Sequence, residues 1–422
     1  MMSTHSPEMS VLSSPQRRCH LLLMLCLPES VVTVESVCQL NGVDHAVTRQ
    51  DIAEVGEEIQ RYHHLAIELD ELGALRLYGT HLDQRLCLLH NLRRALRLSP
   101  AFIHNDFSSV IKQQLQTLPV DKALYDEHNL AALVQYCSLH LDREFSARDT
   151  QFLQVWLRYA LAWHCQPDFT APQLHWIEGK PEFSLAQAIA RCWSKRGYQA
   201  AVNEVALLAL LFSQLHIPQI QHTLSAHERQ LLQSVQLLIQ RFQALSGMVF
   251  SNDEGLSAQL YTHLAQALER TLFSIGIDHN LVDDIAQQYP RLLRTTREAI
   301  AALEQQYSVQ FTDEEMGLIA IIFGAWLLQE SALQEKQVLL LIGRDSELEQ
   351  QVEQQLRELT LLPLTIKYQD VADFQRHSAP KGIALVITPY ATPLPLYSPP
   401  LIHAELPLGE HQQRSIRLLL ES

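Results

Sequence analysis

The sequence predicts a mainly helical protein with a small α/β domain at its C-terminal end. Three patterns support this fold class. Short segments with apolar residues at helical spacing fill residues 16–62, residues 83–335 keep helical patterns with few glycines, and continuously apolar strands flank a helix after Lys336. A chain of 422 residues is long enough for about three domains, each with its own core.

Charge and cysteine content limit the classes of function. The chain has 32 Lys and Arg against 47 Asp and Glu, a formal net charge of −15. Such a chain repels polyanions, so any contact with nucleic acid has to come from a locally basic face. The 7 cysteines are odd in number and lack CxxC spacing, which fits a reducing cytoplasm better than a disulfide framework.

Nothing in the apolar pattern predicts contact with a membrane. The apolar run 20–27 follows two arginines, but it is short and no small-residue cleavage site follows it, so we do not predict a signal peptide. No apolar stretch reaches the roughly 20 residues that span a bilayer. We therefore expect a cytoplasmic protein without membrane attachment.

The N-terminal region carries the pattern of three helices and a hairpin. Residues 1–15, rich in Ser, Pro and Thr, are predicted to be a disordered lead-in. Helices are predicted at 16–27, 34–41 and 49–62, with Thr33 and Thr48 as N-caps of the last two. Alternating apolar positions in 65–79 predict a β-hairpin. This order is typical of a winged helix-turn-helix, which we predict for residues 16–82. The alternative is a small helical domain with a hairpin and no role in nucleic-acid binding.

Two arginines are the candidate DNA contacts of this domain. Arg49 lies on the predicted third helix and Arg76 on the predicted wing. Phosphate contacts would supply affinity, and side chains in the major groove would supply specificity. Against this hypothesis, residues 1–99 hold nine arginines and no lysine against twelve acidic residues, a poor electrostatic footprint for DNA.

An internal repeat occupies the helical middle of the chain. Residues 204–212 (EVALLALLF) align with 315–323 (EMGLIAIIF) at an offset of 111, and the same offset places 188–190 on 299–301. Upstream, residues 153–157 align with 260–264 at an offset of 107. Agreement at three places in the same order indicates a duplication. We predict two tandem all-helical domains, at residues 100–218 and 225–332.

The composition changes at Lys336. Apolar strands are predicted at 338–342, 364–368 and 382–388, with a helix at 346–360. Continuously apolar strands are typical of a parallel sheet, so residues 336–422 are predicted to form a small α/β domain. Five prolines between 389 and 400 predict an extended loop there.

The repeat residues also carry a family resemblance. Residues 260–280, which include His263, Arg270 and Asn280, and residues 289–324 (YPRLLRTTREAI to FTDEEMGLIAIIFG) resemble the two halves of a PTS regulation domain, or PRD. PRDs occur in pairs in regulators of bacterial sugar operons. The full order resembles the larger activators, which join a winged helix, two PRDs and a domain similar to the IIB component of the sugar phosphotransferase system (PTS). The resemblance implies a homodimer, and we expect no cofactor.

The resemblance also identifies candidate phosphoacceptors. Each PRD carries two histidines that accept a phosphoryl group from HPr or another PTS protein, because a neutral imidazole is nucleophilic at cytoplasmic pH. Only His263 is a histidine here, and the other three positions hold Trp156, Leu211 and Ile322. His263 is either a residual phosphorylation site or a helix histidine that a neighbouring group satisfies. The IIB-like loop 343–346 lacks the phosphorylated cysteine of that family, which predicts a degenerate domain.

Two functional hypotheses remain. The sequence contains no HExxH, no paired Cys/His zinc spacing, no GxxxxGK[ST] and no GxSxG, so we expect neither an enzyme nor a metal site. The first hypothesis is a DNA-binding regulator of transcription. The second is a protein-interaction module derived from a sugar-operon regulator, without DNA binding.

Overall fold

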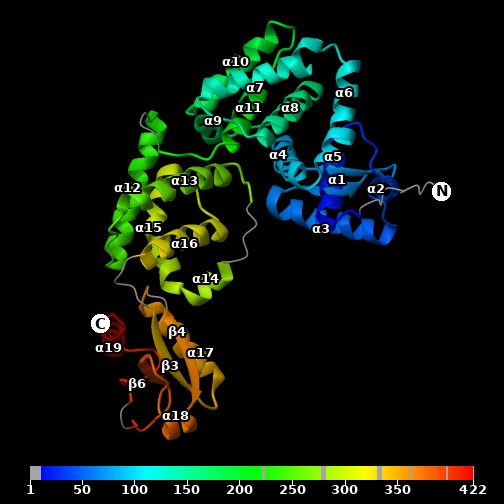
Figure 1. Cartoon of the computed structure of the whole chain (residues 1–422). Coiled ribbons are helices and arrows are strands. Elements are labelled where there is room, and N and C mark those ends of the chain that lie inside the picture. The colour runs from blue at the N-terminus through cyan, green and yellow to red at the C-terminus, as the bar shows by residue number, and fades with distance from the viewer. Residues whose placement is uncertain are drawn as a thin grey trace, which may run out of the picture. The chain divides into compact units, whose positions relative to one another are not determined.

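The computed structural model of the chain describes residues 11–220, 224–276, 282–329, 335–361, 364–395 and 398–421 (Figure 1). Helices predominate, and the larger of the two sheets in the described residues, with four strands, lies near the C-terminus, which confirms the predicted fold class at this coarse level. Most of the predicted lead-in and Asn280 lie outside the described residues. None of the described helices combines the length and apolar character that a membrane span requires.

The chain divides into two compact units. The first comprises Met1–Ile217 with Leu272–Gly276, and the second comprises Pro218–Thr271 with Ile277–Ser422. The first unit therefore contains the predicted N-terminal domain and the first copy of the repeat. Most of the second copy and the α/β region belong to the second unit.

The three predicted helices and the hairpin are present at the start of the first unit. They are α1 (Ser14–Leu25), α2 (Val34–Asn41), α3 (His45–His63), β1 (Ala66–Leu69) and β2 (Leu75–Tyr78), followed by α4 (His81–Leu98). β1 and β2 pair antiparallel, and Val32 adds an isolated bridge to Leu75. Apolar side chains of these helices and strands share one core, whose members include Leu22, Val37, Ile59, Leu75 and Cys87. Helix α4 packs against α1 and α3 and so extends this core beyond residue 82.

The start of the third helix was predicted wrongly. Helix α3 begins at His45, and its N-cap is Asp44, whose side chain accepts a hydrogen bond from the Val47 amide. Thr48 is fully buried inside the helix, where its hydroxyl accepts a hydrogen bond from the Cys38 thiol. Asp is as good an N-cap as Thr, and the earlier start adds a turn of backbone hydrogen bonds.

The two copies of the repeat have the same five-helix order. In the first copy these helices are α7 (Glu127–Leu141), α8 (Ala147–Ala162), α9 (Ala171–Glu178), α10 (Pro181–Ser194) and α11 (Val202–Gln214); in the second they are α12 (Ala226–Ser246), α13 (Asp253–Leu272), α14 (Val282–Gln288), α15 (Pro290–Tyr307) and α16 (Asp313–Gln329). Helix α7 packs on α10 as α12 packs on α15, and α10 packs on α11 as α15 packs on α16. Phe212 and Phe323, which the repeat aligns, are both buried. Before the first copy lie α5 (Pro100–Phe102), a π-helical turn (Ile103–Phe107), α6 (Ser108–Thr117) and a 3₁₀ turn (Lys122–Leu124).

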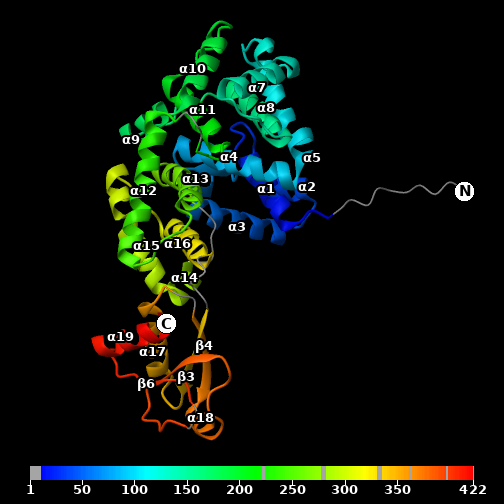
Figure 2. The same ribbon diagram turned by 60° about the vertical axis from the view of Figure 1, so that its left-hand side comes forward.

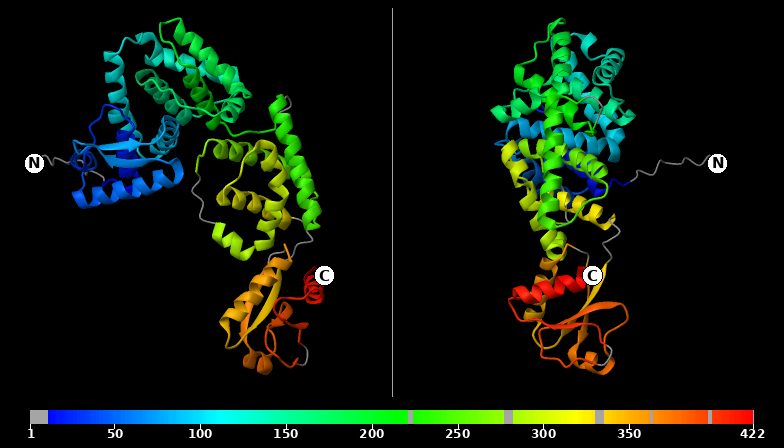
Figure 3. Two further views of the ribbon diagram at one scale, coloured as in Figure 1. Left: turned by 180° about the vertical axis from the view of Figure 1, so that it is seen from behind. Right: turned by 90° about the vertical axis from the view of Figure 1, so that its left-hand side faces the viewer.

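The C-terminal region is a three-layer α/β domain (Figures 2 and 3). Its parallel sheet has the strand order β4-β3-β5-β6, formed by β3 (Lys336–Ile342), β4 (Leu364–Asp370), β5 (Ile383–Thr388) and β6 (Leu401–His403). Val338 and Leu340 pack toward α17 (Ser346–Leu359) and α19 (Glu410–Glu421), whereas Leu339 and Leu341 pack toward α18 (Val371–His377). The predicted parallel strands and the helix between them are confirmed, and β6 is an additional short edge strand.

Candidate phosphoacceptor site

His263, the only histidine among the four predicted acceptor positions, lies on α13. Arg270 follows it seven residues later, about two helical turns, so both side chains lie on one face of the helix. The first turn of α16 faces them with Glu315. Thr312 caps this turn, because its hydroxyl accepts a hydrogen bond from the Glu315 amide at 3.3 Å. The site therefore joins the middle of one helix to the start of another.

Glu315 is the centre of a charged cluster. Its side chain is 2% exposed, and Arg270 donates two hydrogen bonds to it, from Nε at 2.6 Å and from Nη2 at 3.1 Å. His263 Nε2 lies 3.5 Å from Glu315 Oε2, within ion-pair distance but outside hydrogen-bonding alignment. Burial alone would raise the pKa of Glu315, but the contacts with His263 and Arg270 outweigh it and lower this pKa.

This arrangement opposes phosphorylation at Nε2 of His263. The atom is buried and points toward the Glu315 carboxylate. A phosphoryl group would add about −1.5 to −2 charge beside a carboxylate that is already ionised. The side chain as a whole is 16% exposed, so a phosphoryl donor could reach Nε2 only after the ring turned away from Glu315. The geometry favours His263 as a partner of the buried carboxylate.

The first copy contains the same carboxylate in a different setting, with the exposed His164 ring 3.7 Å from it and Arg85 lining the same cavity. Glu204 aligns with Glu315, and the offset of 107 places Trp156 and Trp163 at the positions of His263 and Arg270. Both tryptophans and Glu204 line one cavity of about 20 Å³. Glu204 accepts hydrogen bonds from the Tyr198 hydroxyl at 2.9 Å and from the Ala201 amide at 3.3 Å. Burial dominates here and raises the pKa of Glu204.

The second predicted acceptor position of each copy is buried. Leu211 lies seven residues after Glu204 on α11, and Ile322 lies seven residues after Glu315 on α16. Their exposed fractions are 1% and 8%. Both side chains lie in the interior of their copies of the repeat and carry no group that could accept a phosphoryl group.

Sequence reasoning did not single out Glu315, the last of three consecutive acidic residues that begin at Asp313. Asp313 is 69% exposed, whereas Glu315 is buried. Two signals could have identified it. The repeat places a glutamate at both copies of this position, and apolar residues follow it directly in both copies.

The two predicted DNA contacts lie in different environments. Arg49 is exposed on α3 and makes no hydrogen bond or ion pair within the described residues. Arg76 lies on β2, where it contacts Asp70 at 3.3 Å and donates hydrogen bonds to the carbonyls of Pro28 and Ser30. Arg76 therefore holds the hairpin against the loop after α1, and only Arg49 is free to meet a ligand.

The loop after β3 is closed by side chains of its own domain. The Gly343 amide donates to the Glu349 carboxylate at 2.5 Å, and the Asp345 amide donates to the Tyr390 hydroxyl at 3.0 Å. Tyr390 also donates to Glu349 at 2.7 Å. A backbone turn that could cradle a phosphate is thus occupied by a carboxylate and a phenol.

Comparisons with known proteins agree with these features. The PRD domain family model matches residues 236–326, which begin within α12 and end within α16, and the model of the "Stationary phase-inducible protein CsiE, C-terminal domain" matches residues 336–420. The transcriptional regulator ManR of Bacillus subtilis (strain 168) is 22% identical over 398 residues, which cover 90% of this chain and 58% of ManR. The resemblance to PRD-containing regulators is thereby confirmed.

A second relative covers the whole chain. The stationary phase-inducible protein CsiE of Escherichia coli (strain K12) is 49% identical over 426 residues, which cover 100% of both proteins. The resemblance to this protein extends from SSPQRRC (13–19) near the start of the chain to SPPLI (398–402) near its end. The chain therefore belongs to the family of the stationary phase-inducible protein CsiE.

Proposed function

We propose that the protein regulates transcription as a PRD-type regulator that has lost most of its phosphoacceptor sites. The observation that carries this proposal is the PRD match over the second copy of the repeat. The same chain has three helices and a hairpin near its N-terminus. The similarity to the transcriptional regulator ManR over 90% of the chain supports the same class of function. We expect a role in binding and no catalysis.

In this proposal the two copies of the repeat, α7–α11 and α12–α16, are tandem PRDs, and two chains associate through them as a homodimer. Their equal helix order and equal pairings support a duplication of one domain. Because three acceptor positions are apolar and buried and His263 faces Glu315, phosphoryl transfer from HPr or another PTS protein is not the main signal. The C-terminal domain is a degenerate IIB-like domain whose phosphate loop is closed by Glu349 and Tyr390.

The N-terminal domain is proposed to bind DNA as a winged helix-turn-helix, with α3 as the recognition helix and β1–β2 as the wing. The acidic residues of α3 do not all oppose this. Asp51 pairs with Arg17 at 2.7 Å, Glu54 with Arg18 at 2.8 Å, and Glu58 with Arg94 at 2.6 Å. These pairs neutralise three carboxylates and leave Arg49 on the exposed face.

One observation favours the second candidate, a protein-interaction module without DNA binding. The tip of the hairpin carries Glu71 and Leu72, and Leu72 is 93% exposed. An acidic and apolar tip suits a protein partner better than a phosphate backbone. The same three ion pairs also occupy arginines that DNA binding would otherwise use.

Gel shifts of the full chain against genomic fragments, in a salt series, test the proposal. A DNA-binding regulator retards a subset of fragments, and its affinity falls steeply with salt. Absence of any retarded fragment at low salt would reject direct DNA binding and leave the protein-interaction module. Retardation of every fragment alike would indicate nonspecific binding and would also count against a sequence-specific regulator.

A further inference from the structure

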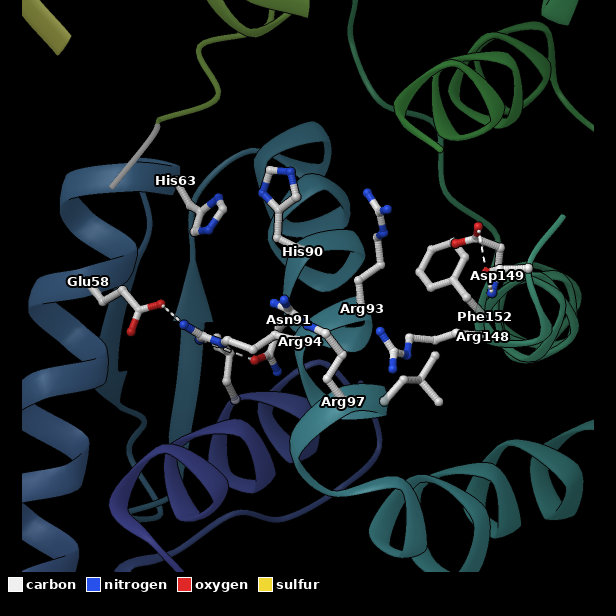
Figure 4. Close-up of a pocket in the computed structure, with 13 residues that line it drawn as sticks. Glu58, His63, His90, Asn91, Arg93, Arg94, Arg97, Arg148, Asp149 and Phe152 are labelled. Carbon is white, nitrogen blue, oxygen red and sulfur yellow. Dashed lines mark hydrogen bonds and ion pairs between the residues drawn. The ribbon is translucent and has the colours of Figure 1, made fainter. Parts of the chain in front are cut away.

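A cavity of the first unit is lined by four arginines. Its volume is about 580 Å³, and it lies between α3, α4 and the first turn of α8 (Figure 4). Helix α4 contributes His90, Arg93, Arg94 and Arg97, which share one helix face because they are spaced three, four and seven residues apart. Arg148 reaches from α8 toward α4. No predicted acceptor position or predicted DNA contact lines this cavity.

The positive charge of the cavity is not balanced by its own carboxylates. Four arginines stand against two acidic residues, Glu58 and Asp149. Glu58 is already bound to Arg94 at 2.6 Å, and Asp149 accepts a hydrogen bond from the Ser146 hydroxyl at 2.9 Å. Arg97 and Arg148 are exposed and have no hydrogen-bond or ion-pair partner within the described residues.

Burial and the nearby positive charges lower the pKa values of two side chains of the cavity. Burial, then the charges of Arg94 and His64, lower the pKa of His63 to about 4. Burial also lowers the pKa of Arg93, and Arg97 lowers it further although Asp149 opposes the effect. The cavity therefore concentrates positive potential in a chain whose net charge is −15.

The walls of the cavity offer apolar and aromatic surface beside these charges. The rings of His63 and His90 lie 5.4 Å apart between centroids, and Leu96 and Phe152 line the cavity as well. Sites for small organic molecules have volumes of about 300–1,000 Å³ and combine such surface with a few polar groups. An arginine fork matches the geometry of phosphate oxygens, because it donates two parallel hydrogen bonds.

We propose that this cavity binds a small organic phosphate, with Arg97 and Arg148 on the phosphate group and the organic part against His63, His90 and Phe152. The volume accommodates a nucleotide or a sugar phosphate, whereas a duplex is too wide to enter it. Because the ligand would contact α3, α4 and α8 together, its binding would stabilise their mutual packing. The inference does not depend on the proposed role in transcription.

Calorimetric titration of the full chain at low ionic strength tests the proposal. The probes are AMP, ATP and glucose 6-phosphate, with adenosine and glucose as uncharged counterparts and inorganic phosphate as the bare anion. The phosphorylated probe of the correct class is expected to bind, and its uncharged counterpart is expected not to bind. Comparison of AMP and ATP with glucose 6-phosphate shows whether the ligand is a nucleotide or a sugar phosphate. Arg97→Gln and Arg148→Gln should each weaken binding by about tenfold or more, since each removes charge-assisted hydrogen bonds.

Arg191→Gln is the matched control, because Arg191 is an exposed arginine of the same unit that does not line the cavity. It should leave the affinity unchanged, and circular dichroism should show wild-type helix content for all three variants. The proposal is overturned if none of the organic phosphates binds at millimolar concentration, or if Arg191→Gln weakens binding as much as the cavity variants. Inorganic phosphate binding as tightly as the organic probes would indicate an adventitious ion only. DNA or an acidic peptide bound through the same arginines, with no organic phosphate bound, would also reject it.

Discussion

Glu204 and Glu315 occupy the same position, the third residue of α11 and of α16, yet their pKa values shift in opposite directions. Both carboxylates are buried at the start of a helix, where the helix dipole favours negative charge. The difference comes from the facing helix. Arg270 donates two hydrogen bonds to Glu315 and His263 lies beside it, whereas Trp156 and Trp163 stand at the aligned positions near Glu204. The cations near Glu204, the exposed His164 at 3.7 Å and Arg85, do not outweigh its burial.

Exchanging each carboxylate for its amide should therefore have unequal effects. Glu315→Gln removes the anionic partner of Arg270 and should lower the free energy of unfolding by about 1–3 kcal/mol. Glu204→Gln keeps an acceptor for the Tyr198 hydroxyl and removes a poorly solvated charge, so stability should change by less than about 0.5 kcal/mol or increase. Hydrogen–deuterium exchange of α13, α16, α8 and α11 measures the two effects separately. Equal losses in both variants would contradict the assigned difference.

The opposite shifts also predict opposite dependences on pH. Since the pKa of Glu315 is lowered by folding, its contribution to stability is present above the ordinary value of 4.5 and is lost as pH falls through the lowered folded value. The pKa of Glu204 is raised, so its contribution increases as pH falls from that raised value toward 4.5. Urea midpoints of wild type minus each Gln variant, followed through acidic pH, should therefore slope in opposite directions. Parallel slopes would reject this assignment.

Phosphorylation by the PTS should be weak. Incubation with phosphoenolpyruvate, enzyme I and HPr should give little or no phosphoprotein, because three acceptor positions are apolar and Nε2 of His263 faces Glu315. Any label should disappear in His263→Ala. A Glu315→Gln variant removes the opposing carboxylate charge and should label no less than wild type. Stoichiometric label that survives His263→Ala would place an acceptor elsewhere and reject the interpretation.

DNA binding, if the gel shifts detect it, should depend on Arg49 more than on an arginine elsewhere in the first unit. Arg49→Ala should weaken binding by about 1–3 kcal/mol if its side chain reaches a base edge. Arg191→Ala, at another exposed position, serves as the control. Arg76→Ala should chiefly loosen the hairpin, which thermal denaturation measures. An unchanged gel shift in Arg49→Ala would remove this residue from the interface.

Two copies of the chain should associate as a homodimer through their proposed PRDs, as the family resemblance implies. Light scattering of the full chain at micromolar concentration should give twice the mass of one chain. Because Trp156, Leu211 and Ile322 are apolar and buried, adding phosphoenolpyruvate, enzyme I and HPr should leave this mass unchanged. A monomeric mass would reject the predicted dimer.

Local patterns in the sequence determined the helical class, the hairpin and the parallel α/β domain. Helix periodicity, strand alternation and residue identity are properties of neighbouring positions, so they can be recognised without a tertiary structure. The start of α3 shows the limit of such reasoning. Asp44 and Thr48 are both acceptable N-caps, and the buried contact between Thr48 and Cys38, ten residues earlier, helps to fix Thr48 inside the helix.

Only the tertiary structure decided which charges meet. Glu315 lies 45 residues from Arg270, and Glu58 lies 36 residues from Arg94. No local sequence pattern therefore predicts either ion pair. The same holds for the cavity in which Arg148 faces α4. Whether a carboxylate or an arginine is solvated, paired or unbalanced depends on the burial and the partners that packing gives it, and those contacts join segments far apart in the chain.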